Sequence, residues 1–98
     1  MYRIMYDRQA AKDIKRLKSA GIEDKAKILI DTIQNNPYQN PPRYEKLVGN
    51  LSGLLSRRIN IQHRIVYQVY EEPVTEKGID YQGTVKIIRM WSHYEGVK

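Results

Sequence analysis

The side chains best suited to chemistry gather in one basic stretch and near the end of the sequence. Residues 50–69 run NLSGLLSRRINIQHRIVYQV, and eight consecutive positions of this stretch include Arg57, Arg58, His63 and Arg64. A second histidine, His93, lies further on, within WSHYE at 91–95. Arginine binds phosphate through charge and paired hydrogen bonds, and histidine transfers protons near neutral pH. This combination predicts a site that handles phosphate, and it suggests cleavage of RNA.

RNA differs from DNA in carrying its own nucleophile, the 2′-hydroxyl, beside each phosphate. Cleavage without a metal therefore needs a base for that hydroxyl, an acid for the departing 5′ oxygen and cations for the charge on phosphorus. Glu45 could serve as the base, His93 as the acid, and Arg58 with Arg64 as the cations. Each proton transfer is worth about 10²- to 10⁴-fold, so loss of one member should cripple the reaction.

Each of these residues also has an ordinary alternative role. A glutamate on a basic protein, such as Glu45, is usually solvated or paired with a cation. Arg64 begins an apolar strand, where a structural role is equally compatible with its position. His63 faces the opposite way from Arg64, so we expect it to support the loop or the edge of the core.

Arg57 and Arg58 are neighbours in a predicted strand and must point to opposite faces. At most one of them, for which we favour Arg58, can reach an open site. We expect the other to pair with a carboxylate such as Glu71 or Glu72, which leaves Arg57 at most a secondary contact with RNA.

Length and composition limit the class of protein. A chain of 98 residues makes a single domain, 1–98, with one modest core. Its net charge of +6 favours an anionic partner, and its eight Tyr and one Trp supply rings that can stack on bases. The absence of cysteine excludes a thiol nucleophile, a thiolate metal site and disulfides.

The sequence predicts neither a metal nor another cofactor. The two histidines lie thirty residues apart, and neither has a carboxylate at ligand spacing. No apolar run approaches the length of a membrane span, and residues 1–9 lack the apolar stretch of a signal peptide. We therefore expect a cytoplasmic protein that has no membrane partner.

Hydrophobic periodicity predicts two helices followed by a β-rich half. In chain order we expect a strand at 1–7, helices at 7–20 and 22–35, an ordered loop at 35–46, and strands at 56–61, 63–72 and 84–94. Asp7 should cap the first helix and Gly21 should end it. Helices joined so tightly form a hairpin that covers one face of a sheet, which is an α+β fold.

Period-two alternation then assigns the faces of the strands. It predicts that Ile59 and Ile61 oppose Arg58, and that Met90 opposes Arg89. If the apolar faces lie under the helices, the open face gathers the basic residues Arg58, Arg64, Arg89 and His93.

Taken together, these residues make the sequence resemble the YoeB/Txe toxins of bacterial toxin–antitoxin modules, within the RelE/ParE superfamily. The resemblance rests on YEKLVGNLSGLLSRRINIQHRIVYQV at 44–69 and KIIRMWSHYE at 86–95. The series Glu-x-Leu, Asn-Leu-Ser-Gly, Ser-Arg-Arg-Ile and His-Arg-Ile-Val-Tyr, ending in His-Tyr, is highly specific. It implies the RelE-like fold of microbial RNases, a small twisted antiparallel sheet with an N-terminal helix hairpin on one face.

The resemblance also implies an activity. These toxins are ribosome-dependent messenger RNA endonucleases that cleave in the A site, and an acidic antitoxin of the YefM/Axe kind silences them. The site residues it implies are the base Glu45, the phosphate-binding Arg58 and Arg64, the acid His93 and the substrate-orienting Tyr94. The neighbours expected to meet ribosomal or messenger RNA are Lys46, Arg57, Arg89 and Trp91. The expected partners are the antitoxin, the ribosome and messenger RNA, and a homodimer is left open.

Two other classes of function remain as alternatives. A superfamily member that binds a protein target such as DNA gyrase would not need an acid and a base, so the presence of both Glu45 and His93 argues against it. A basic RNA-binding module without activity would leave the same two residues unexplained.

Overall fold

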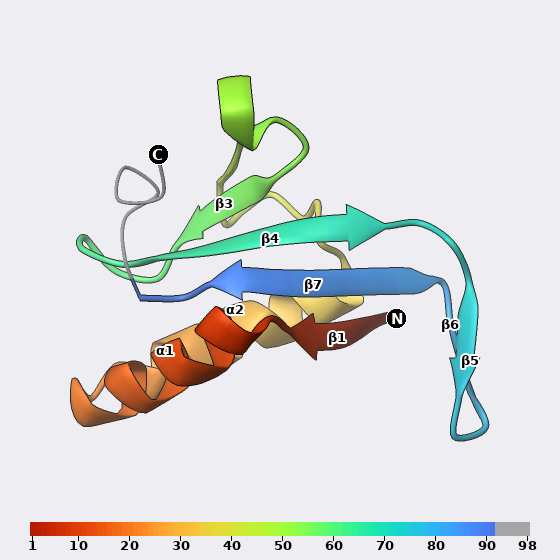
Figure 1. The fold of residues 1–98 in the computed structure, drawn as a ribbon, viewed down its shortest axis with the longest axis horizontal. Coiled ribbons are helices and arrows are strands. Elements are labelled where there is room, and N and C mark those ends of the chain that lie inside the picture. The colour runs from red at the N-terminus through yellow and green to blue at the C-terminus, as the bar shows by residue number, and fades with distance from the viewer. Residues whose placement is uncertain (92–98) are drawn as a thin grey trace.

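A computed structural model describes residues 1–91 of the chain. Its elements are β1 (Tyr2–Tyr6), α1 (Arg8–Ser19), α2 (Glu23–Asn35), β2 (Tyr44–Lys46), the 3₁₀ turn η1 (Gly49–Leu51), β3 (Leu55–Arg58), β4 (Arg64–Tyr70), β5 (Val74–Glu76), β6 (Ile79–Tyr81) and β7 (Gly83–Arg89). Five strands form one sheet in the order β1-β7-β4-β3-β2, and β5 and β6 form a separate hairpin. The two helices lie side by side on one face of the sheet (Figure 1).

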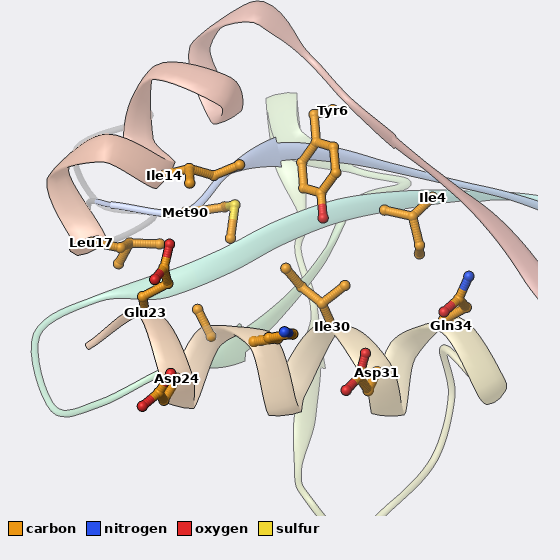
Figure 2. A pocket seen from close by; sticks show the side chains of 12 residues that line it. Ile4, Tyr6, Ile14, Leu17, Glu23, Asp24, Ile30, Asp31, Gln34 and Met90 are labelled. Carbon is orange, nitrogen blue, oxygen red and sulfur yellow. The ribbon is translucent and has the colours of Figure 1, made fainter. Parts of the chain in front are cut away.

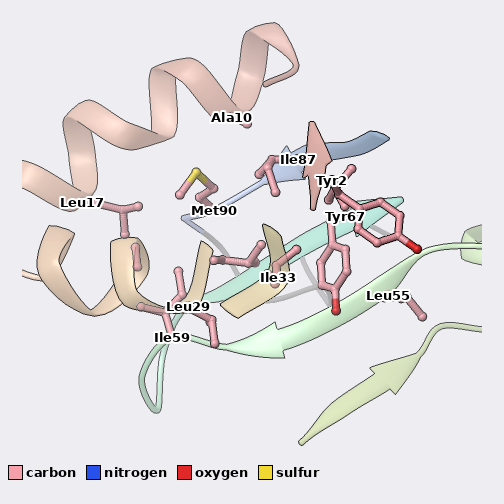
Figure 3. Packing of buried hydrophobic residues seen from close by; sticks show 13 residues of the cluster. Tyr2, Ala10, Leu17, Leu29, Ile33, Leu55, Ile59, Tyr67, Ile87 and Met90 are labelled. Atoms are coloured by element: carbon pink, nitrogen blue, oxygen red, sulfur yellow. The ribbon is translucent and has the colours of Figure 1, made fainter. Parts of the chain in front are cut away.

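The predicted helix hairpin is confirmed. The side chain of Asp7 accepts a hydrogen bond from the backbone N–H of Arg8 at 3.0 Å, which caps α1. After Ala20 the chain turns at Gly21, whose φ of +75° is one that residues with a side chain seldom adopt. The buried residues that the helices press onto the sheet are Ala10, Leu17, Ala26, Leu29 and Ile33 (Figure 3).

The sheet is mixed, which differs from the antiparallel sheet that we expected. The pairs β2–β3, β3–β4 and β4–β7 are antiparallel, but β1 lies parallel to β7. At the start of the parallel pair, Tyr2 lies opposite Gly83. A Cβ atom on Gly83 would be 2.7 Å from the Tyr2 ring and would collide with the carbonyl oxygen of Tyr70, so only glycine permits this approach.

The middle strands are shorter than predicted, because Asn60 closes a tight turn between them. Its side-chain oxygen accepts hydrogen bonds from the N–H of Gln62 at 2.9 Å and of His63 at 2.7 Å. Ile59 is buried as expected, but Ile61 lies in the turn and is 86% exposed. The prediction that Ile59 and Ile61 share a strand face is therefore wrong. The predicted loop is also shorter, since its last three residues form β2.

A β-bulge in β7 changes which of its residues face the core. Val66 pairs with Arg89 but the next residue of β4, Tyr67, pairs with Ile87, so β7 carries one extra residue. As a result Ile87 and Met90 both enter the core. Arg89 is opposite Val66 in the register, but the prediction that it contributes to the open face is wrong, because its side chain forms an ion pair with a residue of α1.

That residue is Asp13, which was not among the predicted site residues. Its side chain is fully buried, and one carboxylate oxygen accepts hydrogen bonds from Arg89 Nε at 2.9 Å and from the backbone N–H of Met90 at 3.0 Å. A buried carboxylate is stable only when it is paired and hydrogen-bonded, and both conditions are met here. Asp13 thereby fastens α1 to the end of β7.

A pocket of about 500 Å³ lies between the helix hairpin and β1 (Figure 2). Its apolar lining includes Ile4, Ile14, Ile30 and Met90, and its charged lining is Glu23, Asp24, Asp31 and Lys27. Tyr6 also points into it, and burial, followed by the charge of Asp31, raises the pKa of that phenol. The pocket has more carboxylates than cations, so it is not the phosphate site that the sequence predicts. None of the helices within residues 1–91 is long and apolar enough to cross a membrane.

Tyr67 provides a test of the packing through pH. Its phenol is fully buried, accepts a hydrogen bond from Arg57 Nε at 2.9 Å and donates one to the carbonyl of Pro37 at 2.8 Å. Burial raises the pKa of this phenol, although its contact with Arg57 acts in the opposite direction. The folded state therefore holds the proton to a higher pH than the unfolded state, where tyrosine titrates near about pH 10.

We expect Tyr67→Phe to lower the free energy of unfolding at pH 8 by about 1–3 kcal/mol, because Arg57 Nε loses its acceptor and the Pro37 carbonyl loses one of its two donors. The stabilising effect of a raised pKa is lost as the pH rises past that of the unfolded tyrosine. The difference in free energy of unfolding between the natural protein and Tyr67→Phe should accordingly be smaller at about pH 10.5 than at pH 8. Urea unfolding at the two pH values measures it, and a gap that stays constant would contradict the prediction.

Candidate active site

Three neighbouring strands bring the main predicted site residues to one face of the sheet. Glu45 on β2 pairs with Ser56 on β3, and Arg58 on β3 pairs with Arg64 on β4. The alternate residues of β3 and β4, including Leu55, Ile65 and Tyr67, belong to the core beneath the helices. Glu45, Ser56, Arg58 and Arg64 therefore occupy the face turned away from the helices. In this part of the sheet, period-two alternation predicted the open face correctly.

Glu45 and Arg64 make direct contact. Arg64 Nη2 lies 3.1 Å from Glu45 Oε1, and Arg64 Nε donates a hydrogen bond to Ser56 Oγ at 2.6 Å. The Arg64 side chain is only 9% exposed, whereas that of Glu45 is 35% exposed. Arg64 is thus held in place by Glu45 and Ser56, while the carboxylate stays partly open to solvent. Ser56, which is fully buried, is a site residue that we did not predict.

Arg58 lies directly across the strand pair from Arg64 and is exposed. Like charges at directly opposed positions of an antiparallel pair are destabilising. Folded proteins tend to retain such unfavourable contacts at functional sites. An anion that binds between Arg58 and Arg64 would relieve their repulsion. The face therefore combines a carboxylate with two cations suited to a phosphate.

His63 and Trp91 stack on each other beside this site. Their ring centroids are 4.1 Å apart and their planes are inclined by 22°. Trp91 is half-buried and packs against the core, and His63 closes the turn that leads into Arg64. This geometry agrees with the supporting role expected of His63. His93 and Tyr94, the predicted acid and substrate-orienting tyrosine, lie outside the described residues.

The sequence model of the family described as "YoeB-like toxin of bacterial type II toxin-antitoxin system" matches residues 6–94. The chain belongs to this family. Toxin YoeB of Mycobacterium bovis is 45% identical over 47 residues, which are 48% of this chain and 55% of that protein. The chain thus spans about half the length of the curated relatives that it matches. The resemblance to YoeB/Txe toxins is confirmed.

Solved structures of YoeB toxins have a similar fold. A YoeB–YefM complex from Staphylococcus aureus has a chain that is 30% identical with a TM-score of 0.70, covering 96% of this chain and 99% of its own. A YoeB/ParE toxin from Agrobacterium tumefaciens gives a TM-score of 0.74 at 24% identity, covering 94% and 99%, and this likeness concerns the fold alone. The α+β fold predicted from the sequence is confirmed.

Among the predicted RNA contacts of this YoeB-like chain, Arg57 needs the largest correction. Its side chain is fully buried, and its guanidinium donates hydrogen bonds to the Tyr67 hydroxyl and to the carbonyls of Pro37, Gln39 and Pro42. These acceptors replace the carboxylate, such as Glu71 or Glu72, that we expected as its partner. A fully enclosed guanidinium is not available to RNA, so Arg57 belongs to the core.

The other predicted contacts also lie apart from the carboxylate. Lys46 is exposed, but it pairs with the core residue Leu55 and so points to the opposite face of β2 from Glu45. Arg89 is held by Asp13 on the helix side. One face of Trp91 is covered by His63. Within residues 1–91 there is no group of three or more His, Asp or Glu that could hold a metal ion.

The two arginines of the site should respond differently to neutralisation. Arg58→Gln removes a like-charge repulsion, so we expect the free energy of unfolding to rise by about 0.5 kcal/mol. Arg64→Gln breaks a largely buried ion pair and the contact with Ser56, so we expect a loss of about 2 kcal/mol. Chemical denaturation at low salt compares the two variants. Equal destabilisation by both would show that the repulsion between the arginines is not significant.

Proposed function

We propose that this chain is the toxin of a type II toxin–antitoxin module and that it cleaves messenger RNA in the ribosomal A site. The observation that carries the proposal is the contact between Glu45 and Arg64, with Arg58 opposite, on the face of the sheet turned away from the helices. Membership of the YoeB-like family supports it. The dependence on the ribosome comes from the family resemblance.

In the proposed reaction, Glu45 accepts the proton of the 2′-hydroxyl, and the 2′ oxygen forms a bond to phosphorus. The bond from phosphorus to the 5′ oxygen breaks, and His93 gives that oxygen a proton. Arg58 and Arg64 stabilise the negative charge that builds on the phosphate. The products are a 2′,3′-cyclic phosphate and a 5′-hydroxyl end. Tyr94 is proposed to orient the substrate.

Because Glu45 contacts Arg64, phosphate binding should precede proton transfer in this reaction. In the free protein the Arg64 guanidinium is shared between Glu45 and Ser56. A phosphate that binds to Arg58 and Arg64 competes with Glu45 for the same cation. Its arrival therefore releases the carboxylate close to the substrate hydroxyl. The base becomes available when the phosphate is in place.

The partners follow from the same surface. A net charge of +6 and two adjacent arginines suit an acidic antitoxin segment that folds across Arg58, Arg64 and residues 93–94. A Staphylococcus aureus relative has been solved as a YoeB–YefM toxin–antitoxin complex, and also as a YoeB dimer. We propose an antitoxin of the YefM kind for this chain, with the cytoplasm as its place of action and a homodimer as a further state to test.

Substitution of the proposed base and acid tests the function. Glu45→Gln and His93→Gln should each slow cleavage of messenger RNA by about 10²- to 10⁴-fold, because each removes one proton transfer. They should also suppress growth inhibition and leave antitoxin binding intact. Primer extension on translated messenger RNA measures the cleavage, with and without ribosomes.

Glu72→Gln is the matched control, since Glu72 is an exposed carboxylate outside the site. It should cleave like the natural protein. Full cleavage by Glu45→Gln would remove Glu45 from the mechanism. Inhibition of DNA supercoiling without cleavage by the natural protein would instead favour a toxin directed at gyrase.

A further inference from the structure

We propose that Arg57 is a positioning residue, which holds Glu45 against Arg64 by fixing the loop that leads into β2. This inference rests on the proposed function, in which Glu45 is the base. Arg57 lies on the core side of β3, between Ser56 and Arg58 of the open face. It cannot touch RNA from there, so any effect it has on cleavage must pass through its neighbours.

The buried charge of Arg57 is stabilised by hydrogen bonds to uncharged oxygens. The four acceptors are the Tyr67 hydroxyl at 2.9 Å, the carbonyls of Pro37 at 3.0 Å and Gln39 at 2.8 Å, and the carbonyl of Pro42. All four oxygens are uncharged. Burial of an unpaired ion is very costly unless its donors are hydrogen-bonded, so the guanidinium requires these carbonyls to converge on it.

Three of these acceptors belong to the loop between α2 and β2. The loop contains Pro37, Pro41 and Pro42, which have no backbone N–H to donate, and it has no helix or strand of its own before Tyr44. Arg57 therefore replaces the backbone hydrogen bonds that would fix a regular element. The Tyr44 ring completes the enclosure, with its centroid 5.0 Å from Arg57 Cζ.

The loop in turn sets the position of Glu45. Strand β2 has three residues and lies at the edge of the sheet, so few ladder bonds hold its register. In the observed register Tyr44 pairs with Arg57, and Glu45 pairs with Ser56. A slip by one residue would turn the Glu45 side chain to the helix face, away from Arg64. Anchoring the loop on Arg57 opposes that slip.

Arg57→Lys is the sharpest variant, because it keeps the charge but concentrates its donors on one atom that cannot span the four acceptors. We expect cleavage at saturating substrate to fall by about tenfold to 10²-fold, since a small misplacement of a catalytic group has effects of this size. Arg3→Lys is the control, because Arg3 makes one exposed ion pair with Glu76 and lies outside the site. It should leave the rate unchanged.

A double-mutant cycle separates positioning from general destabilisation. If Arg57 acts through Glu45, Arg57→Lys should slow the natural protein strongly but slow Glu45→Gln little, because the carboxylate it positions is already gone. Equal fold losses in the two backgrounds would overturn the proposal. If Arg57→Lys does not fold, Tyr67→Phe, which removes one acceptor, enters the same cycle with a smaller expected loss.

Hydrogen exchange tests the positioning without any need for cleavage. In Arg57→Lys the amides of residues 38–46 should exchange faster than in the natural protein, while those of β4 and β7 stay protected. Unchanged exchange in the loop would overturn the proposal even if the rate falls. If the natural protein does not cleave RNA at all, the proposed function fails, and faster loop exchange would still show that Arg57 holds β2.

Discussion

A buried guanidinium must have its donors matched by acceptors, and Arg57 imposes this constraint near the middle of the fold. Its hydrogen bonds join β3 to β4 through Tyr67 and join both strands to the loop after α2. An apolar residue at this position would remove the donor that Arg57 supplies to the carbonyls of Gln39 and Pro42, and would leave the Pro37 carbonyl with Tyr67 alone. The loop between α2 and β2 is thus anchored by one charge in the core.

Asp13 is a second buried charge, and it connects α1 to the end of β7. It joins α1 to Arg89 and Met90, and the next residue, Trp91, stacks on His63 beside Arg64. Two buried charged residues therefore flank the open face: Arg57 fixes the loop that leads into β2, and Asp13 fixes the end of β7. Because those charges are enclosed, they can position the site without competing for a phosphate. Arg58 and Arg64 lie opposite each other on the face turned away from the helices.

The sequence was informative where local rules apply and misleading where distant groups decide. Alternation separated Arg58 from Arg57 correctly, because β3 is regular over those residues. It failed at Arg89, whose side chain is held by Asp13 of α1 although its position in the register is opposite Val66, and at Ile61, where Asn60 ends the strand. Arg57 was expected to seek a carboxylate, since no pattern shows that carbonyls fifteen to twenty residues earlier will converge on it. The pairing of Asp13 with the end of β7 depends on residues more than seventy positions away and has no local signal.

The opposed residues Arg58 and Arg64 differ in exposure, and this difference suits each to a different role in binding a phosphate. Arg64 is almost enclosed and already bonded to Ser56 and Glu45, so little side-chain entropy remains for it to lose when an anion binds. Arg58 is exposed, and ordering it would have a larger entropic cost, which the relief of its repulsion with Arg64 partly offsets. A phosphate between them would therefore meet one preorganised cation and one that adapts. Since preorganisation is what makes a charged group effective at a transition state, Arg64 is the arginine whose position matters more, and Glu45 on β2 and Ser56 on β3 help to hold it there.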